Sequence, residues 1–337
     1  MKKVIIYLTI IASTISCSQK KQKPMIEITA KNIVEQITSQ VKHYPKEPFY
    51  QIYVANSLCV YELLVNDFPV HKQFEYAQLA TPIYINYNIL KSGKQKVTIR
   101  LYPAHKEFNW RNGEFFSPET TCRISLEVND NAKGLPVDGN IELQKIEMPT
   151  VIRMAGEKND FKILEFAGKG QKYFEHSFYF DAQVPYVNTG WSEGQDLRKL
   201  DQKELEKEVV KFYLARKDET EKQNIDAIAK QAFAPLKEQF VAEYNDKERI
   251  KKGWNEYIAP YKSSVYKFQL LENYKMVFYG DGKMVTLEQK STDVRLRGKS
   301  ALWALFIDAE GTERAHLNGI SLIVPQGKSI NQLQAIR

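Results

Sequence analysis

The segment Thr121-Cys122-Arg123-Ile124-Ser125-Leu126-Glu127-Val128 decides the fold class, because its side chains alternate between apolar and polar. This alternation predicts a β-strand with one face in a hydrophobic core and the other in water. The segments 97–102 and 141–146 alternate in the same way, and 49–54, 58–65, 83–85, 161–166 and 173–180 also have the composition of strands. Short alternating strands of this kind predict an antiparallel β-sandwich.

The segment from Leu90 to Ile99 resembles the closing hairpin of immunoglobulin-like and jelly-roll binding modules. We therefore expect residues 25–150 to form an N-terminal immunoglobulin-like β-sandwich domain. Within it, residues 30–41 have apolar side chains at helical spacing and predict a short helix, with a strand as the alternative.

A different pattern begins at residue 201 and predicts helices over residues 201–257. Asp201 and Glu204 have the spacing of a capping box, and apolar residues then recur every three or four positions. Pro235 is expected to kink or divide the second helix, since an interior proline costs about 3 kcal/mol.

Strands return after the helices, at 274–279, 284–289, 301–307 and 316–324. The first two flank Gly280-Asp281-Gly282-Lys283, which predicts a hairpin turn. Residues 151–337 are thus expected to form an α+β domain with helices packed on an antiparallel sheet. That order of elements is similar to cystatin-like and nuclear-transport-factor-like folds, and the whole chain is predicted to be mainly β with α.

The N-terminus has the order of a secretory signal peptide over residues 1–16: Lys2 and Lys3, an apolar run, then small residues. The apolar run is far shorter than the roughly 20 residues of a membrane-spanning helix. Thr14-Ile15-Ser16-Cys17 resembles the lipobox of bacterial lipoproteins, although threonine replaces the usual leucine. This resemblance implies cleavage before Cys17 and lipidation of its thiol.

The polar residues 17–24 are suited to a lipidated tether. We therefore expect a cell-envelope protein, anchored at the outer membrane through acyl chains on Cys17. The alternative is a secreted protein cleaved elsewhere, or a buried N-terminal strand.

Removal of the signal leaves 321 residues, a length suited to two domains. Aromatic residues make up 12% of the chain and charged residues 26%, which is typical of a globular protein. The formal charge of +7 falls to +5 when Lys2 and Lys3 are removed. The basic residues are dispersed along the chain, so nucleic acid is not an expected partner.

Cys59 and Cys122 remain once Cys17 is lipidated, and an even pair in an oxidising compartment predicts a disulfide. Such a bridge would stabilise the fold by roughly 4 kcal/mol in the chain-entropy model. The alternative is two separate buried thiols that behave as small apolar residues.

Motifs that would indicate chemistry are missing from the sequence. No two of the five histidines have metal-ligand spacing, and the nucleophile elbow Gly-x-Ser-x-Gly does not occur. Gly298-Lys299-Ser300 and Gly327-Lys328-Ser329 lack the earlier glycine of a phosphate-binding loop and are interpreted as surface turns. We predict no catalytic residue, no metal and no cofactor.

The connection from Pro103 to Glu119 is unusually long for a compact sandwich, and long loops are often functional. It contains Phe108, Trp110, Phe115 and Phe116, which suit a surface that recognises a partner. The alternative is that these rings are hidden core. Tyr186 and Trp191, in an irregular segment, leave the same two interpretations open.

The segments 59–67 and 272–283 resemble parts of Gram-negative bacterial lipoproteins in which a β-sandwich is joined to an α+β domain. The resemblance implies no particular activity. Our hypothesis is a non-catalytic, lipid-anchored envelope protein that binds a protein or glycan partner. A narrower version is an immunity protein that neutralises a delivered toxin, and the alternative is a hydrolase that acts on cell-envelope polymers.

Overall fold

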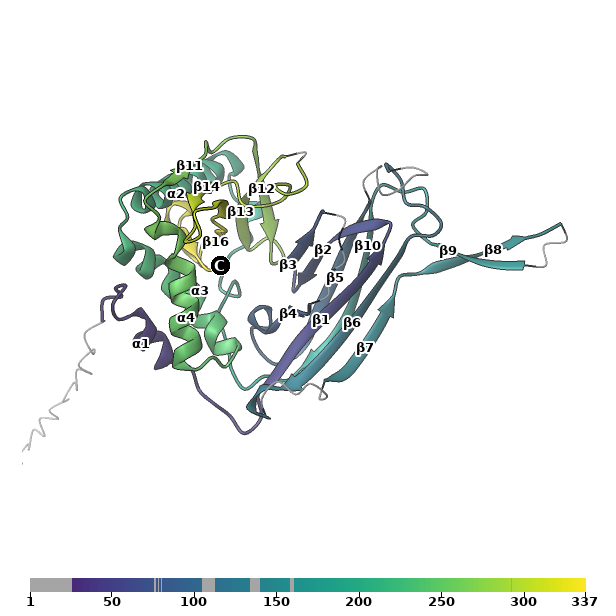
Figure 1. Ribbon diagram of the computed structural model, residues 1–337, viewed down its shortest axis with the longest axis horizontal. Coiled ribbons are helices and arrows are strands. Elements are labelled where there is room, and N and C mark those ends of the chain that lie inside the picture. The colour runs from purple at the N-terminus through teal and green to yellow at the C-terminus, as the bar shows by residue number, and fades with distance from the viewer. Residues whose placement is uncertain are drawn as a thin grey trace, which may run out of the picture.

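The computed structural model describes residues 26–75, 77, 79, 81–104, 113–133, 140–157, 161–291 and 293–337. In these residues the chain is mainly β, with 17 strands in five antiparallel sheets and four α-helices. Figure 1 shows a half made of two sheets, a half that contains the helices, and an arm that projects from the first half. The predicted signal peptide, Cys17 and the tether lie outside the described residues.

The two-sheet half has four strands in each sheet. The first sheet has the order β4 (Ile83–Tyr84), β1 (Pro48–Ser57), β6 (Thr121–Asp130) and β7 (Ile141–Glu147). The second has the order β10 (Phe174–Ala182), β5 (Gly93–Pro103), β2 (Cys59–Val65) and β3 (Phe68–Gln73). Apolar side chains of both sheets, among them Ile52, Leu63, Ile99 and Ile124, form one hydrophobic core.

The alternating segment that predicted this half forms β6 and is confirmed as a strand. Cys122, Ile124 and Leu126 are buried, and β6 pairs with β1 along ten residues. β10 lies beyond the expected boundary at residue 150, yet it pairs with β5 along its whole length. The two-sheet half therefore extends to residue 182.

The arm consists of β8 (Thr150–Ala155) and β9 (Phe161–Phe166), which pair only with each other among the described strands. It projects away from both halves (Figure 1). Large apolar side chains are exposed on it, namely Val151, Ile152, Met154, Phe161, Ile163 and Leu164.

The other half has three long helices, α2 (Gln202–Glu221), α3 (Ile225–Ala242) and α4 (Lys247–Ile258). One sheet beside them has the order β11 (Tyr266–Phe268), β14 (Trp303–Ile307) and β15 (Glu313–Leu317). The other has the order β12 (Tyr274–Tyr279), β13 (Met284–Gln289), β16 (Leu322–Ile323) and β17 (Gln334–Ala335). The short helix α1 (Ile33–Thr38) packs on α3 and α4 through Ile33 and Ile37.

Local signals in this half agree with the structure at two points. The Asp201 carboxylate accepts hydrogen bonds from the amides of Lys203 and Glu204, so the predicted N-cap of α2 is confirmed. The hairpin at 280–283 is confirmed as well, with Tyr279 paired to Met284. The predicted division of the helix at Pro235 is wrong, because α3 continues through this residue.

No helix in the described ranges is long and apolar enough to cross a membrane.

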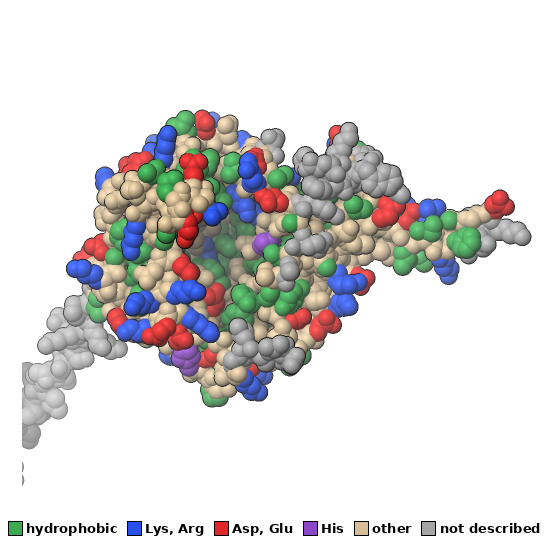
Figure 2. Space-filling view, viewed as in Figure 1, with side chains coloured by type: hydrophobic (Ala, Val, Ile, Leu, Met, Phe, Trp, Pro, Cys, Tyr) green, Lys and Arg blue, Asp and Glu red, His purple; other side chains and the backbone are tan. Residues whose placement is uncertain are grey.

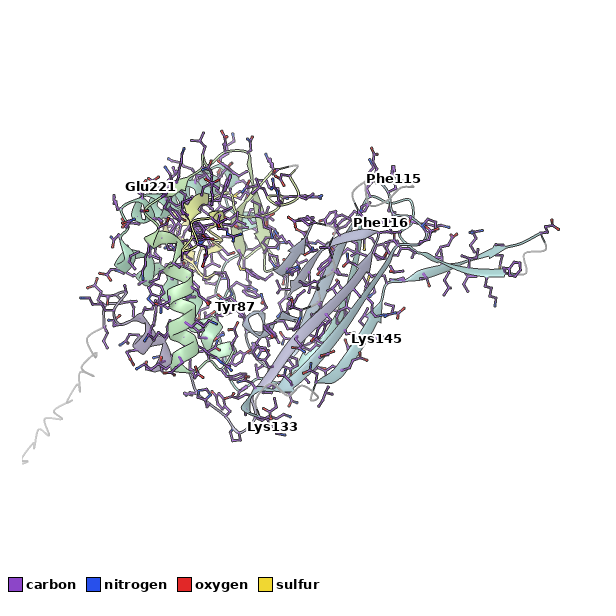
Figure 3. All side chains as sticks on the ribbon, viewed as in Figure 1. Tyr87, Phe115, Phe116, Lys133, Lys145 and Glu221 are labelled. Atoms are coloured by element: carbon purple, nitrogen blue, oxygen red, sulfur yellow. The ribbon has the colours of Figure 1, made fainter. Side chains whose placement is uncertain are left out.

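Buried hydrogen bonds join the two halves. The Asn86 amide donates to the Ala242 carbonyl at 3.0 Å, and the Tyr87 hydroxyl donates to the Pro235 carbonyl at 3.1 Å. Figure 3 shows Tyr87 between the halves, and Figure 1 marks the C-terminal end nearby. The halves thus hold a fixed position relative to each other around this junction.

Candidate binding site

Those predicted partner-binding residues that the structure describes do not gather on one surface. Phe108 and Trp110 lie outside the described residues. Phe116 is buried at the end of the two-sheet half, edge-on to the ring of Phe166 at 5.1 Å, whereas Phe115 is only half-buried (Figure 3). Among the described aromatic residues of that connection, only Phe115 keeps exposed area for a partner.

Tyr186 and Trp191 are also buried, at 4% and 6% exposure. The Tyr186 hydroxyl donates to the Asn86 carbonyl at 2.9 Å, and the Trp191 ring stacks on Phe68 at 5.5 Å. Their role as direct partner contacts needs correction, because packing between the halves covers both rings. Trp191 instead supports Phe68, which lines the cleft described next.

No disulfide joins Cys59 and Cys122 in the structure, where both are buried free thiols. The Cys59 thiol donates to the Thr121 carbonyl at 3.5 Å, and the neighbouring Cys59 thiol together with burial raises the pKa of Cys122. The predicted disulfide is therefore absent from this structure, which agrees with the alternative of two buried thiols, and a bridge under oxidising conditions stays a prediction.

A cleft lies between the two halves and consists of two adjoining cavities. The inner cavity, of about 230 Å³, is walled by α2, α3, α4 and the end of the chain. The outer cavity, of about 370 Å³, lies between β3 and the sheet that contains β13. The two share Phe68, Gly319, Ile320 and Arg337. Figure 2 shows this hollow between the halves, with basic side chains on its walls.

The inner cavity has a guanidinium group on an otherwise mostly apolar wall. Arg216 is 5% exposed and donates to Gln231 Oε1 at 2.6 Å, Tyr257 Oη at 2.8 Å and Tyr261 Oη at 3.4 Å. All of these acceptors are neutral, and no ion pair of Arg216 with a carboxylate occurs in the described part of the chain. Since arginine stays protonated in proteins, the cavity wall carries an uncompensated positive charge.

The second arginine at the cleft is neutralised. Arg337 donates to Glu238 Oε2 at 2.8 Å and to the Tyr87 carbonyl at 3.1 Å, and its guanidinium lies over the Tyr87 ring. Glu238 also accepts hydrogen bonds from the amides of Thr189 and Gly190. This arginine therefore fastens the two halves together rather than offering a free charge.

The outer cavity contains a compensated lysine. Lys72, on β3, donates to Glu288, to the Tyr279 hydroxyl at 3.0 Å and to the Gly298 carbonyl at 2.9 Å. Glu62 lies 3.7 Å away as a second carboxylate. These contacts fix the side chain and cancel its charge.

Lys299 supplies the free charge of the outer cavity. It is half-buried, and no ion pair of its ammonium group is found among the residues that the structure describes. Burial and nearby Lys72 lower the pKa of Lys299, and the Glu75 carboxylate offsets part of this shift. Burial also lowers the pKa of neighbouring His71, which is therefore neutral near pH 7.

The cleft thus presents two cations without an ion-pair partner among the described residues, Arg216 inside and Lys299 outside, with largely apolar and aromatic surface between them. Concave, mostly apolar sites with a few placed polar groups are typical of ligand pockets. A buried charge is costly unless a counter-charge reaches it, so the arrangement favours an anionic ligand.

Neither Arg216 nor Lys299 is predicted as a site residue from the sequence. Lys299 belongs to a segment whose pattern indicates a surface turn, and Arg216 belongs to no recognisable motif. A signal for Arg216 exists, since the buried positions of α2 are Leu205, Val209, Tyr213, Arg216 and Thr220. An arginine in the apolar phase of a helix marks a buried cation.

Comparison of the chain with protein-family models, with curated proteins and with solved structures gives no match. The function is therefore argued from the residues of this chain alone.

Proposed function

We propose that this chain is a non-catalytic binding protein of the cell envelope, and that its ligand is an anion held in the cleft between the two halves. The observation that carries the proposal is the buried Arg216 guanidinium, which lines a cavity and pairs only with neutral acceptors. A ligand carboxylate or phosphate would provide the missing counter-charge through a bidentate contact.

A fatty-acid probe with a matched neutral analogue tests this proposal by isothermal titration calorimetry. Hexanoate should bind the purified protein at least tenfold more tightly than hexanamide, because hydrogen bonds to charged groups contribute about 1.5–3 kcal/mol. Arg216→Gln should remove that preference. Arg123→Gln is the control, since Arg123 lies half-exposed on β6 and carries the same charge. Equal binding of both probes, or an unchanged preference in Arg216→Gln, would contradict the proposal.

The proposal also includes a fold class for each of the two halves. The two-sheet half is interpreted as an immunoglobulin-like sandwich and the helical half as an α+β domain, with the ligand between them. Shared hydrophobic cores support this interpretation, one between the two sheets and others around the helices.

Anchoring through Cys17 is the second part of the proposal and rests on the N-terminal sequence. Cys17→Ser should leave the protein uncleaved or soluble, because the thiol is the acyl acceptor. Cell fractionation and intact-mass measurement test this, and unchanged membrane retention with an unchanged mass would contradict it.

A protein partner is a second candidate function, and the arm is the observation that favours it. Ile152 and Leu164 are paired across β8 and β9 and are 61% and 66% exposed. Apolar surface of this kind typically marks a protein or membrane contact. The arm lies at the opposite end of the molecule from α1, the first described helix (Figure 1). In a chain anchored through residues that precede α1, the arm would be the end far from the anchor, which favours a protein contact.

A photo-crosslinking residue at position 152, introduced into the full-length protein in cells, tests this second candidate. We expect an adduct whose mass differs from twice that of the chain, and we expect it to disappear when Leu164 is also changed to serine. An adduct of exactly two chains, or one that contains only lipid, would overturn it. The same probe at Leu270, which is 77% exposed on the helical half, is the control.

A further inference from the structure

The two free cations of the cleft lie in different cavities. Arg216 lines the inner cavity and does not line the outer one, whereas Lys299 lines the outer cavity and not the inner one. The cavities adjoin at Phe68, Gly319, Ile320 and Arg337, and Arg337 is paired with Glu238, so the surface between the two cations is largely apolar and carries no unpaired charge. A small anion on Arg216 would leave Lys299 uncompensated.

The remaining charged groups of the cleft form no ion pair with either cation among the described residues, and this includes Glu75, which offsets part of the pKa shift of Lys299. Lys72 is paired with Glu288 and Glu62, and Arg337 is paired with Glu238. Glu288 is fully engaged, since it also accepts from the Tyr279 hydroxyl at 2.6 Å. Arg216 and Lys299 have no carboxylate ion-pair partner in the described part of the chain, so they indicate two separate positions for the negative charges of a ligand.

We propose that the cleft binds an elongated ligand with an acidic group at each end, one on the Arg216 guanidinium and the other on the Lys299 ammonium. This inference rests on the proposed function and specifies its ligand class. The apolar middle of the ligand packs against Phe68 and Ile320. The inner cavity, at about 230 Å³, admits one end and the outer cavity admits the other.

Binding of straight-chain dicarboxylates, from succinate to sebacate, tests the proposal in the full-length protein. Affinity should pass through an optimum with chain length, and the best dicarboxylate should bind at least tenfold more tightly than hexanoate. A parallel series of α,ω-diphosphonates distinguishes carboxylate from phosphate-type groups, and an optimum in either series supports the proposal.

Single variants then assign each end of the ligand. Arg216→Gln and Lys299→Gln should each lower the affinity for the best diacid to that of a monoacid, whereas Arg216→Lys should restore part of it. Lys299→Gln should lower the affinity for the best diacid more than it lowers the affinity for hexanoate, because hexanoate has a single acidic group. Arg123→Gln again serves as the control, and circular dichroism verifies that each variant is folded.

The possible failures are distinguishable. If monoacids and diacids bind equally and Lys299→Gln has no effect, the two-ended ligand is refuted while anion binding in the cleft stands. If no acid of either series binds, both the further inference and the proposed function are refuted.

Discussion

Replacement of Arg216 by methionine tests whether this guanidinium serves a ligand or the fold. Removal of an unpaired buried ion relieves a desolvation penalty of several kcal/mol. Against this, the two short hydrogen bonds to Gln231 and Tyr257 are lost, at about 1.5–3 kcal/mol each. The opposing contributions are of similar size, and methionine fills much of the same space. We expect the free energy of unfolding to change by less than about 1.5 kcal/mol.

The matched control is Tyr213, which precedes Arg216 on the same buried face of α2. It is fully buried, and its hydroxyl donates to the Ile320 carbonyl at 2.8 Å. Tyr213→Ala should lower the free energy of unfolding by about 3–5 kcal/mol, as for other large aromatic residues in a core.

Urea unfolding followed by far-ultraviolet circular dichroism measures the free energy of unfolding of both variants. The comparison holds if the slope of this free energy against urea concentration is unchanged. A bound acid present at about 100 times its Kd should add about 2.7 kcal/mol to the wild type and nothing to Arg216→Met. A loss of about 3 kcal/mol or more in Arg216→Met without ligand would refute the reasoning, because the guanidinium would then be part of the structural core.

Three further predictions follow from other buried groups. Burial, with Arg216 nearby, lowers the pKa of His316 to about 4 from 6.5, so the unfolded chain takes up a proton at a higher pH than the folded chain. The free energy of unfolding should therefore fall by about 3 kcal/mol between about pH 6.5 and pH 4. Urea unfolding should show a smaller fall with pH in His316→Asn than in the wild type. Equal falls in both proteins would contradict this. Under oxidising conditions Cys59 and Cys122 should form a disulfide, and mass spectrometry of a non-reduced digest should find their peptides joined; two alkylatable thiols after denaturation would speak against it. Phe116→Ala should cost about 3–5 kcal/mol and Phe115→Ala less than about 1 kcal/mol, as measured by thermal unfolding, and similar losses for both would contradict their different burial.

Strands with a clear apolar face were predictable, whereas β3 was not. Its residues, from Phe68 to Gln73, are all half-buried, so the sequence shows no alternation to detect. β3 pairs with β2 across Asn66 and Asp67, which both have positive φ, and this backbone turn brings the segment into the sheet. One wall of the cleft was therefore missed along with the strand.

Burial of the aromatic residues was likewise not predictable from their own neighbours. Trp191 follows an irregular segment rich in glycine and proline, where an exposed ring is a reasonable expectation. Its contacts come from Phe68, Leu64 and Met284, which lie far away in the sequence. Packing between the halves, which no local pattern encodes, decides that this ring is core.

Arg216 shows where sequence reasoning can be extended and where it ends. Its position in the apolar phase of α2 is visible in the sequence and predicts a buried cation. The sequence cannot say whether a carboxylate of the same chain neutralises that cation, because the carboxylate can come from any element. Arg337 illustrates one outcome, since Glu238 reaches it from α3. Arg216 illustrates the other, since its described partners are an amide and two phenols. The difference between a structural ion pair and a candidate ligand site is thus a property of the fold, because it depends on which distant residues reach each arginine.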